Sequence, residues 1–282
     1  MLKITARAKI NLTLDVLGTL PDGYHEVRTV MQLLDLCDIL EISSGISGIT
    51  LSSDSKKIPI GPENLVYRAA QLLLARTGLE KRAHINIIKR IPVAAGLGGG
   101  SSNAAAALWG LNRFWELGFT PEELMEMGAE IGADVPFFMT AGTALGSGRG
   151  DKLTPLPSPP PMGVLLVKPH FGVSTAQVYK LFDKLPGETK LRTDSMIQAL
   201  EKRDANAIAA HLGNDLEPVT ASLHPEIREI KRELVDAGAL GAEMSGSGPT
   251  VFGLMANKEK ARLLAANIKS NFGDILVSQF EF

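Results

Sequence analysis

Pro92-Val93-Ala94-Ala95-Gly96-Leu97-Gly98-Gly99-Gly100-Ser101-Ser102-Asn103 is the most informative segment of this chain. An alternating apolar segment, 83–91, precedes it and predicts a strand, and residues 104–115 after it predict a helix. Glycines let a backbone approach an anion closely, and the start of a helix presents unpaired N–H groups. The order of strand, glycine-rich turn and helix therefore predicts a phosphate-binding loop, with a plain turn as the alternative.

This loop differs from two common nucleotide-binding motifs. The P-loop requires a Gly-Lys pair, which the chain lacks, and the dinucleotide motif requires a glycine where Ser101 stands. Ser101 and Ser102 open the predicted helix, and their hydroxyls can cap it or donate to a phosphate oxygen. The segment is therefore a candidate phosphate loop of another kind.

The N-terminal segment carries a second pattern. Residues 2–17 place apolar side chains at even positions and mainly polar ones at odd positions. A period of two over this length predicts a long strand with one buried face. Lys9 and Asn11 share its polar face, where a lone lysine is usually solvated. Asp22-Gly23 then predicts a turn.

Strands and helices follow one another irregularly along the rest of the chain. Further strands are predicted at 27–34, 39–42, 49–51, 163–168, 250–254 and 275–280. Helices are predicted at 64–77, from Thr120 to about Gly132, from Ser174 through Leu185, and at 193–203, 204–212, 225–237 and 258–271. This mixture without a regular βαβ rhythm predicts an α+β fold. Prolines crowded into 155–161 predict a boundary between a domain at 1–155 and a domain at 162–282.

Composition excludes several classes of protein. The net charge of −2 gives no electrostatic reason to expect a nucleic-acid binder. The single cysteine, Cys37, excludes an intrachain disulfide and a zinc site built on several thiolates. The apolar segments are too short to cross a bilayer, and no signal peptide is recognisable. We expect a cytoplasmic protein that binds a small molecule and neither nucleic acid nor membrane, as a monomer or a weak homodimer.

Two shorter motifs follow the glycine-rich loop. Residues 132–138 read Gly-Ala-Asp-Val-Pro-Phe-Phe, which places Asp134 among apolar neighbours, where an unpaired carboxylate is costly. Asp134 either caps backbone N–H groups or serves as a base toward a substrate hydroxyl. Residues 244–250 read Met-Ser-Gly-Ser-Gly-Pro-Thr before a predicted strand, which alone is an ordinary glycine turn.

Together, and in this order, the three motifs resemble those of the GHMP kinases (galactokinase, homoserine, mevalonate and phosphomevalonate kinases) across nearly the whole chain. The resemblance implies a two-domain fold, with an N-terminal domain like domain 2 of ribosomal protein S5 and a C-terminal ferredoxin-like α/β-plait. It implies ATP and Mg2+ as cofactors, and a first loop that wraps the ATP phosphates without a P-loop lysine.

The same resemblance assigns roles to residues. It implies Lys9 and Asp134 as the catalytic residues, with Lys9 beside Asp134, where a cation keeps a carboxylate ionised. Asn64 and Leu65 would line the adenine pocket. The residues implied for ATP binding are Asn64, Leu65, Pro92, Gly96, Leu97, Gly98, Gly99, Gly100, Ser101, Ser102, Asn103, Gly246 and Ser247.

Residues 6–12, Ala-Arg-Ala-Lys-Ile-Asn-Leu, and 22–26, Asp-Gly-Tyr-His-Glu, resemble one group within the family. That group phosphorylates the 2-hydroxyl of a cytidine diphosphate-linked methylerythritol on the non-mevalonate route to isoprenoids. Tyr24 and Tyr179 would stack on the cytosine, and His25 would bond its edge unless it is a surface turn histidine. The residues implied for this substrate are Asn11, Tyr24, His25, Thr175 and Tyr179.

The metal ligands and the rival functions stay open. Some family members hold magnesium with a glutamate between the first two motifs, and the glutamates available there are Glu122, Glu123, Glu126 and Glu130. None is assigned, and ATP oxygens and water would hold most of the ion, with Ser102 close. The rivals are a kinase for another small alcohol, a catalytically silent nucleotide sensor, and a structural or nucleic-acid-binding protein on the same N-terminal fold.

Overall fold

The structure is a computed structural model that describes residues 1–140, 142–184, 190–268 and 270–282. The chain forms two compact units. Unit 1 consists of Met1–Ala8, Leu36–Val93 and Gly98–Thr140, and unit 2 consists of Lys9–Asp35, Ala94–Leu97 and Ala141–Phe282. The predicted domain boundary at the proline-rich segment is a sequence-based division and stays a prediction.

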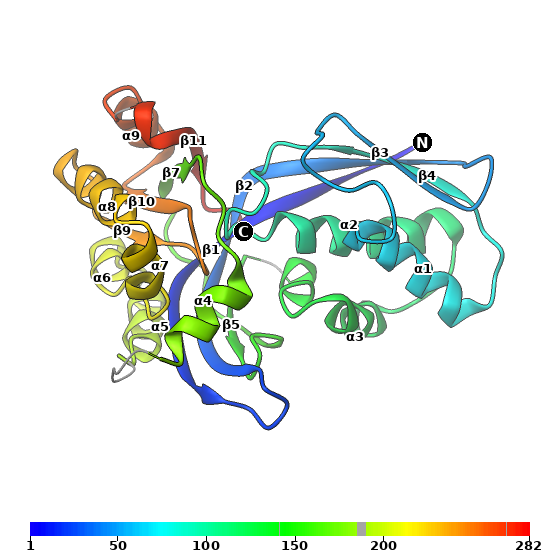
Figure 1. Cartoon of the computed structure of the whole chain (residues 1–282), viewed down its shortest axis with the longest axis horizontal. Coiled ribbons are helices and arrows are strands. Elements are labelled where there is room, and N and C mark those ends of the chain that lie inside the picture. The colour runs from blue at the N-terminus through cyan, green and yellow to red at the C-terminus, as the bar shows by residue number, and fades with distance from the viewer. Residues whose placement is uncertain (141, 185–189, 269) are drawn as a thin grey trace. The chain divides into compact units, whose positions relative to one another are not determined.

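Unit 1 is a sheet with helices on one side (Figure 1). Its sheet has the order β3-β4-β2-β1, in which β3 is parallel and β2 antiparallel to β4. The elements are β1 (Leu2–Thr19) and β2 (His25–Ser43), both shared with unit 2, then β3 (Ile49–Ser53), α1 (Leu65–Thr77), β4 (Ala83–Ile88), α2 (Gly99–Trp115), α3 (Pro121–Ile131) and the 3-10 helix η1 (Pro136–Met139).

The helix ends of unit 1 follow the capping signals in the sequence. Asn64 caps α1 by accepting a hydrogen bond from the Val66 N–H, and Gly78 ends the helix. Thr120 and Glu123 form a reciprocal capping box at the start of α3. Each cap satisfies backbone N–H groups that a helix leaves unpaired, so these predicted boundaries are confirmed.

Helix α2 begins five residues earlier than predicted, at Gly99 instead of Ala104. Its alanine-rich turn, Ala104–Ala107, is buried in the same core cluster as Leu73 of α1 and Ile85 and Ile87 of β4. Burial of this turn compensates for the weak helix propensity of the glycines in the first turn. The helix therefore starts inside the glycine-rich segment.

Unit 2 contains a four-stranded antiparallel sheet of order β11-β7-β10-β9. The strands are β7 (Gly163–Pro169), β9 (Gly241–Met244), β10 (Val251–Met255) and β11 (Gly273–Gln279). Helix α8 (Glu226–Asp236) precedes β9, and α9 (Lys258–Ala265) joins β10 to β11. By position along the chain the sheet order is 4-1-3-2, which is the ferredoxin-like arrangement that the resemblance implied. The predicted α+β class is confirmed.

The remaining elements of unit 2 are short. They are β5 (Thr143–Ser147), β6 (Lys152–Pro155), α4 (Thr175–Phe182), α5 (Thr193–Glu201), α6 (Ala205–Ala210), β8 (Gly213–Asn214), α7 (Glu217–Leu223) and the 3-10 helix η2 (Ser270–Phe272). The predicted strands at 27–34 and 39–42 are one strand, β2, and α7 was not predicted. Helix α4 ends at Phe182, three residues before the predicted end, and Leu185 itself lies outside the described residues. Helix α9 ends at Ala265, well before the predicted 271, and Lys269 also lies outside them.

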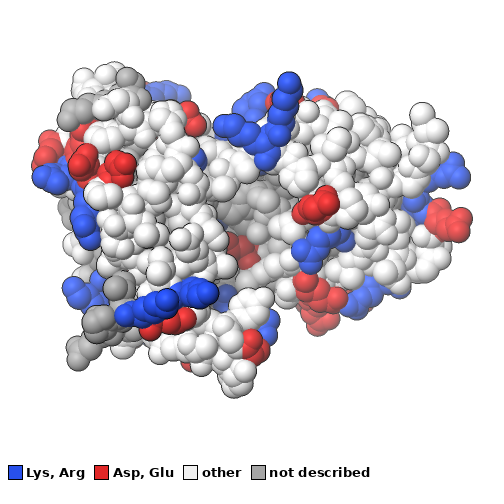
Figure 2. Space-filling model, viewed as in Figure 1, with Lys and Arg blue, Asp and Glu red and all other residues white. Residues whose placement is uncertain are grey.

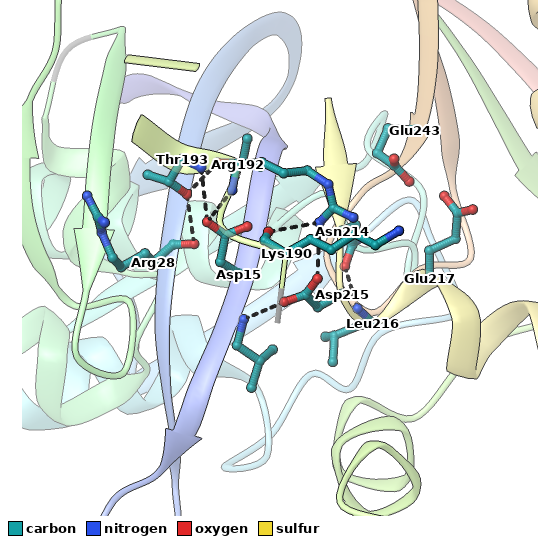
Figure 3. Close-up of polar contacts among 12 residues, drawn as sticks. Asp15, Arg28, Lys190, Arg192, Thr193, Asn214, Asp215, Leu216, Glu217 and Glu243 are labelled. Carbon is teal, nitrogen blue, oxygen red and sulfur yellow. Dashed lines mark hydrogen bonds and ion pairs between the residues drawn. The ribbon is translucent and has the colours of Figure 1, made fainter. Parts of the chain in front are cut away.

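The prediction of one buried face for β1 is wrong for its second half, where both faces are buried from Ala8 to Val16. Thr13 and Asp15 there are bonded to residues distant in sequence. Thr13 Oγ1 lies 3.0 Å from Thr193 Oγ1. Asp15 accepts hydrogen bonds from the backbone N–H groups of Arg192 and Thr193 (Figure 3). A buried polar group is tolerated when it is hydrogen bonded, so these contacts permit burial.

The described helices do not include one that is both long and apolar enough to cross a bilayer. On the face shown in Figure 2, lysines and arginines are interspersed with aspartates and glutamates. This mixed surface agrees with the small net charge of −2.

Candidate active site

The glycine-rich loop makes a close backbone contact within unit 2. Gly96 has φ +74°, and a Cβ atom placed on it would lie only 2.2 Å from the backbone oxygen of Ser245. The Ser245 hydroxyl donates a 2.9 Å hydrogen bond to the Gly96 oxygen. Only glycine satisfies both the backbone conformation and this approach. The first and third predicted motifs therefore meet at Gly96.

The second half of the loop opens α2 in unit 1. The cap residue of the helix, Gly98, provides no side-chain hydrogen bond. The Ser102 hydroxyl is buried and has no hydrogen-bond partner among the described residues. A buried donor is normally satisfied, so the hydroxyl and the N–H groups of the first turn fit a bound anion such as a phosphate.

A buried ion pair stands beside this helix start. Lys89 pairs with the fully buried carboxylate of Asp38, which also accepts a 2.9 Å bond from the Asn103 side chain. The Lys89 ammonium would lie 3.4 Å from a Cβ atom placed on Gly99. Asn103 therefore supports the helix start through Asp38, and Lys89 places a positive charge next to it.

The start of α1 adjoins the start of α2. A Cβ atom placed on Gly100 would lie 3.8 Å from the Leu65 side chain. The Asn64 side chain caps α1 and donates a 2.7 Å bond to the Pro59 oxygen. These contacts place the predicted adenine segment next to the predicted phosphate segment within unit 1, with Pro92 in the loop before α2.

Lys9 is buried, with 4% of its surface exposed, so it is not a solvated strand lysine. Its ammonium donates a 2.7 Å bond to Asn11 Oδ1, and its backbone N–H donates a 3.0 Å bond to the Leu97 oxygen. The Asn11 carboxamide in turn donates to Thr29 at 2.8 Å. Strand β1 therefore holds both side chains beside the glycine-rich loop.

The third motif joins the same region of unit 2. A Cβ atom placed on Gly246 would lie 3.4 Å from Asn11 Oδ1, so the two residues are neighbours. The hydroxyls of Ser247 and Thr175 lie 2.8 Å apart. The structure thus brings together four predicted residues from three separate segments of the chain.

Asp134 lies half-buried in the turn between α3 and η1, in unit 1. The Val135 N–H donates to the Gly132 oxygen at 3.0 Å, and the fully buried Val135 and Phe137 side chains anchor the turn. Lys9 belongs to unit 2, and the predicted pairing of Lys9 with Asp134 stays a prediction.

The glutamates of α3 have other partners. Glu123 belongs to the capping box, and Glu130 pairs with Arg76. Glu122 and Glu126 are exposed. In the described part of the chain, no group of three or more His, Cys, Asp or Glu side chains is arranged to hold a metal ion.

The predicted base-binding aromatics lie on β2 and α4 of unit 2. The His25 and Tyr179 rings are stacked, with centroids 4.5 Å apart and an interplanar angle of 29°. The edge of Phe182 faces His25 at 6.4 Å, and His25 Nε2 lies 2.7 Å from the Asp183 carboxylate. His25 is therefore held by residues of α4 and of its C-terminal end. The bond to Asp183 uses Nε2, so Nδ1 is the other ring nitrogen.

Tyr24 lies in the predicted turn between β1 and β2 and is 58% exposed. The Arg149 guanidinium lies 4.4 Å from the centre of its ring, and Arg149 also pairs with Asp22. Asp22 in turn accepts a 3.0 Å bond from the Tyr24 N–H. A cation over an aromatic face is attractive, so this arrangement fixes the ring and covers one of its faces.

A buried cluster of charged residues lies directly behind the third motif. Lys231 donates to Glu217 at 2.6 Å and to Glu243 at 3.0 Å. Burial, and then the neighbouring Glu217 carboxylate, raise the pKa of Glu243 to about 8. Burial alone would raise the pKa of Glu217, but Glu243 and Lys231 together hold it below its usual value. Near neutral pH the pair of carboxyl groups therefore retains one proton.

Stability should fall as the pH rises toward 8. The folded pair of Glu217 and Glu243 binds a proton that the unfolded chain releases above about pH 4.5. The stability that this proton contributes is therefore complete below that pH and is lost as the pH rises past 8. The expected slope approaches about 1.4 kcal/mol per pH unit, which corresponds to one proton. Urea denaturation between pH 5 and 8 should show a steeper fall in the free energy of unfolding for the wild type than for Glu243→Gln. Equal slopes would contradict the shifted pKa.

Three polar residues were not predicted from the sequence, namely Asp38 and Lys89 in unit 1 and Arg149 in unit 2. Asp38 directly precedes the predicted strand 39–42, where an unpaired carboxylate is expensive to bury. This is a signal that Asp38 has a partner, but it does not identify the partner. Lys89 precedes the glycine-rich loop by a few residues. Arg149 lies more than a hundred residues from its partner Tyr24, and the sequence gives no signal for that contact.

Comparison with known proteins agrees with this geometry. Residues 64–142 match the family described as GHMP kinases N terminal domain, and residues 196–274 match GHMP kinases C terminal. The "4-diphosphocytidyl-2-C-methyl-D-erythritol kinase" of Pelotomaculum thermopropionicum is 54% identical, covering 97% of this chain and 96% of that protein. The protein of the same name from Moorella thermoacetica is 46% identical, covering 99% of both.

A solved structure, "Crystal structure of 4-(cytidine 5'-diphospho)-2C-methyl-D-erythritol kinase", has 32% identity and a TM-score of 0.84 over all of both chains. The sequence comparison and the structure comparison thus identify proteins of the same activity by name, and both matches extend over nearly the full length of the chain. The chain belongs to the GHMP kinases, within the group of 4-diphosphocytidyl-2-C-methyl-D-erythritol kinases.

Proposed function

We propose that this chain transfers the γ-phosphoryl group of ATP to the 2-hydroxyl of 4-diphosphocytidyl-2-C-methyl-D-erythritol, in the non-mevalonate pathway to isoprenoids. The products are ADP, the phosphate monoester and the proton of the hydroxyl. The observation that carries the proposal is the glycine-rich segment that opens α2 with an unsatisfied Ser102 hydroxyl, in a chain that matches kinases of this name over its full length. We place the reaction in the cytoplasm.

The ATP phosphates would lie along residues 96–103. Backbone N–H groups of the first turn of α2 would donate to phosphate oxygens, and the Lys89 ammonium beside Gly99 would add positive charge. Mg2+ would neutralise phosphate charge when bound, and the Ser102 hydroxyl is the side chain that fits a place near it. Asn64 and Leu65 would border the adenine.

The acceptor alcohol would be held by unit 2. Asn11 and Thr175 carry polar atoms beside the third motif and would orient the erythritol part. Tyr24 and Tyr179 would hold the cytosine by stacking, with His25 bonding its edge. Asp134 would accept the proton of the 2-hydroxyl during direct in-line transfer, and Lys9 would stabilise the charge that develops.

ATP consumption by the purified protein, with Mg2+ and the cytidyl substrate, tests this proposal. Mevalonate and homoserine in parallel reactions serve as controls. Turnover is expected with the cytidyl substrate alone, and phosphorus NMR should show a new phosphate monoester. Turnover only with another alcohol would refute the substrate and keep the kinase. Folded protein that binds ATP but turns over none of the three would be a nucleotide sensor.

A further inference from the structure

Residues 245–250 connect β9 to β10, and the first part of this connection, the loop 245–248, is fixed from two sides. On one side its Ser245 backbone oxygen and hydroxyl contact Gly96 of the glycine-rich loop. On the other side the fully buried Thr220 hydroxyl donates a 3.1 Å bond to the Ser247 oxygen. A shift of the residues that hold the loop would therefore also shift the loop against the backbone of Gly96.

Asn214 makes the most extensive contact behind this loop. Its side-chain amide donates to the Met244 oxygen at 2.8 Å and to the Gly246 oxygen at 2.7 Å. Its Oδ1 atom accepts a 2.9 Å bond from the Leu216 N–H (Figure 3). Two acceptors on one side and a donor on the other fix the orientation of the carboxamide. The residue is 4% exposed, so water does not readily replace these bonds.

The segment around Asn214 is itself tied to β1. Strand β8 pairs in parallel with β1, with Leu14 opposite Asn214. Asp215 donates its N–H to the Leu14 oxygen at 2.9 Å and accepts a 3.0 Å bond from the Val16 N–H. Arg192 adds a 3.0 Å ion pair to the same carboxylate (Figure 3). Asn214 therefore lies on a strand, β8, that is hydrogen bonded to β1, and β1 also contains Lys9.

We propose that Asn214 is a positioning residue for ATP. Through its two hydrogen bonds it holds the loop 245–248 against Gly96, and so fixes the phosphate-binding backbone relative to β1. It acts through the loop, not by touching the nucleotide. The inference rests on the proposed function, because it takes ATP as the ligand of this loop. It assigns a positioning role to a residue outside the three motifs.

Isosteric and truncating substitutions test the role. Asn214→Asp keeps the shape of the side chain but presents a carboxylate to two carbonyl oxygens, and Asn214→Ala removes both donors. Each should weaken ATP binding roughly 10- to 100-fold, because two buried hydrogen bonds are lost. Asn214→Asp should raise the Kd of ATP at least as much as Asn214→Ala does. Titration calorimetry measures the Kd of ATP directly.

Asn112 provides a matched control at the far end of α2. Its carboxamide also bonds backbone groups, donating to the Phe119 oxygen and accepting from the Phe119 N–H. Asn112→Asp should lower Tm while leaving the Kd of ATP unchanged. If both aspartate variants weakened ATP binding in proportion to their loss of Tm, Asn214 would be a stability residue only and the proposal would be overturned.

A double-mutant cycle covers the case in which Asn214→Asp does not fold. Ser245→Ala removes the hydroxyl bond to Gly96 on the other side of the loop. If both residues act through the loop, the effects of Asn214→Ala and Ser245→Ala on the Kd of ATP should be clearly non-additive. Additive effects would overturn the proposal. A wild type that binds ATP but shows no turnover would refute the proposed function while leaving this test intact.

Discussion

Asp134→Asn is expected to lower kcat by roughly 10²- to 10⁴-fold, the usual contribution of a positioned general base. Asparagine has the shape of aspartate but does not accept the proton of the 2-hydroxyl. The turn that carries Asp134 is held by the backbone bond between Val135 and Gly132 and by buried apolar side chains. The substitution should therefore leave the turn in place. KM for ATP and for the cytidyl substrate should change by less than about threefold.

Asp236→Asn is a suitable control, since it removes an exposed carboxylate from the end of α8 and should leave kcat unchanged. Steady-state kinetics with both substrates varied, and rapid mixing to separate chemistry from product release, measure the effect. A kcat for Asp134→Asn within tenfold of the wild type would show that another group takes the proton. A large rise in either KM would instead give Asp134 a binding role.

Local signals in the sequence predicted the elements of the fold well. Asn64 caps α1, and Thr120 and Glu123 cap α3. In both caps the bonded partners lie within three residues of each other, so the local sequence is enough to predict the interaction. The start of helix α2 could not be predicted from such local signals. Its first turn consists of residues of low helix propensity, and the packing of Ala104–Ala107 into the core decides that it is helical.

Contacts between distant segments could not be predicted in the same way. The polar side chains of β1 are buried because Thr29 and Thr193 supply hydrogen bonds, and a period-two pattern does not name such partners. For the same reason, the partners of Asp38 and Asn214 could not be predicted. Both are single polar residues whose partners become neighbours only when the chain has folded.

The motif residues of the site were predicted because their chemistry is local. Gly96 through Ser102 combine a flexible backbone, hydroxyls and a helix start in one segment. Asn11, Gly246, Ser247 and Thr175 were predicted from resemblance, and the structure places them together within unit 2. The partners that hold these residues in place, such as Arg149 at Tyr24, came from the structure alone.

Tyr24 is presented to solvent by a small network of charged residues. The Arg149 guanidinium covers one face of the ring, and Asp22 holds both Arg149 and the Tyr24 backbone N–H. Hydrogen bonding to the Tyr24 N–H, then to Arg149, keeps the pKa of Asp22 below its usual value, so the Asp22 carboxylate stays ionised near neutral pH. The ring is therefore fixed before a ligand arrives, and its uncovered face is available for stacking.

Tyr24→Ala should raise KM for the cytidyl substrate by roughly 5- to 150-fold, the range expected when one base–aromatic stack is removed. The KM for ATP and the kcat should remain within about twofold, because Tyr24 lies in a turn and contacts neither the glycine-rich loop nor the turn of Asp134 in the proposed mechanism. Tyr24→Phe keeps the ring and loses only the hydroxyl, so its KM should match the wild type. Steady-state kinetics at saturating ATP distinguish the three proteins. If Tyr24→Phe were as impaired as Tyr24→Ala, the hydroxyl and not the ring would bind the substrate, and an unchanged KM in both would remove Tyr24 from the cytosine site.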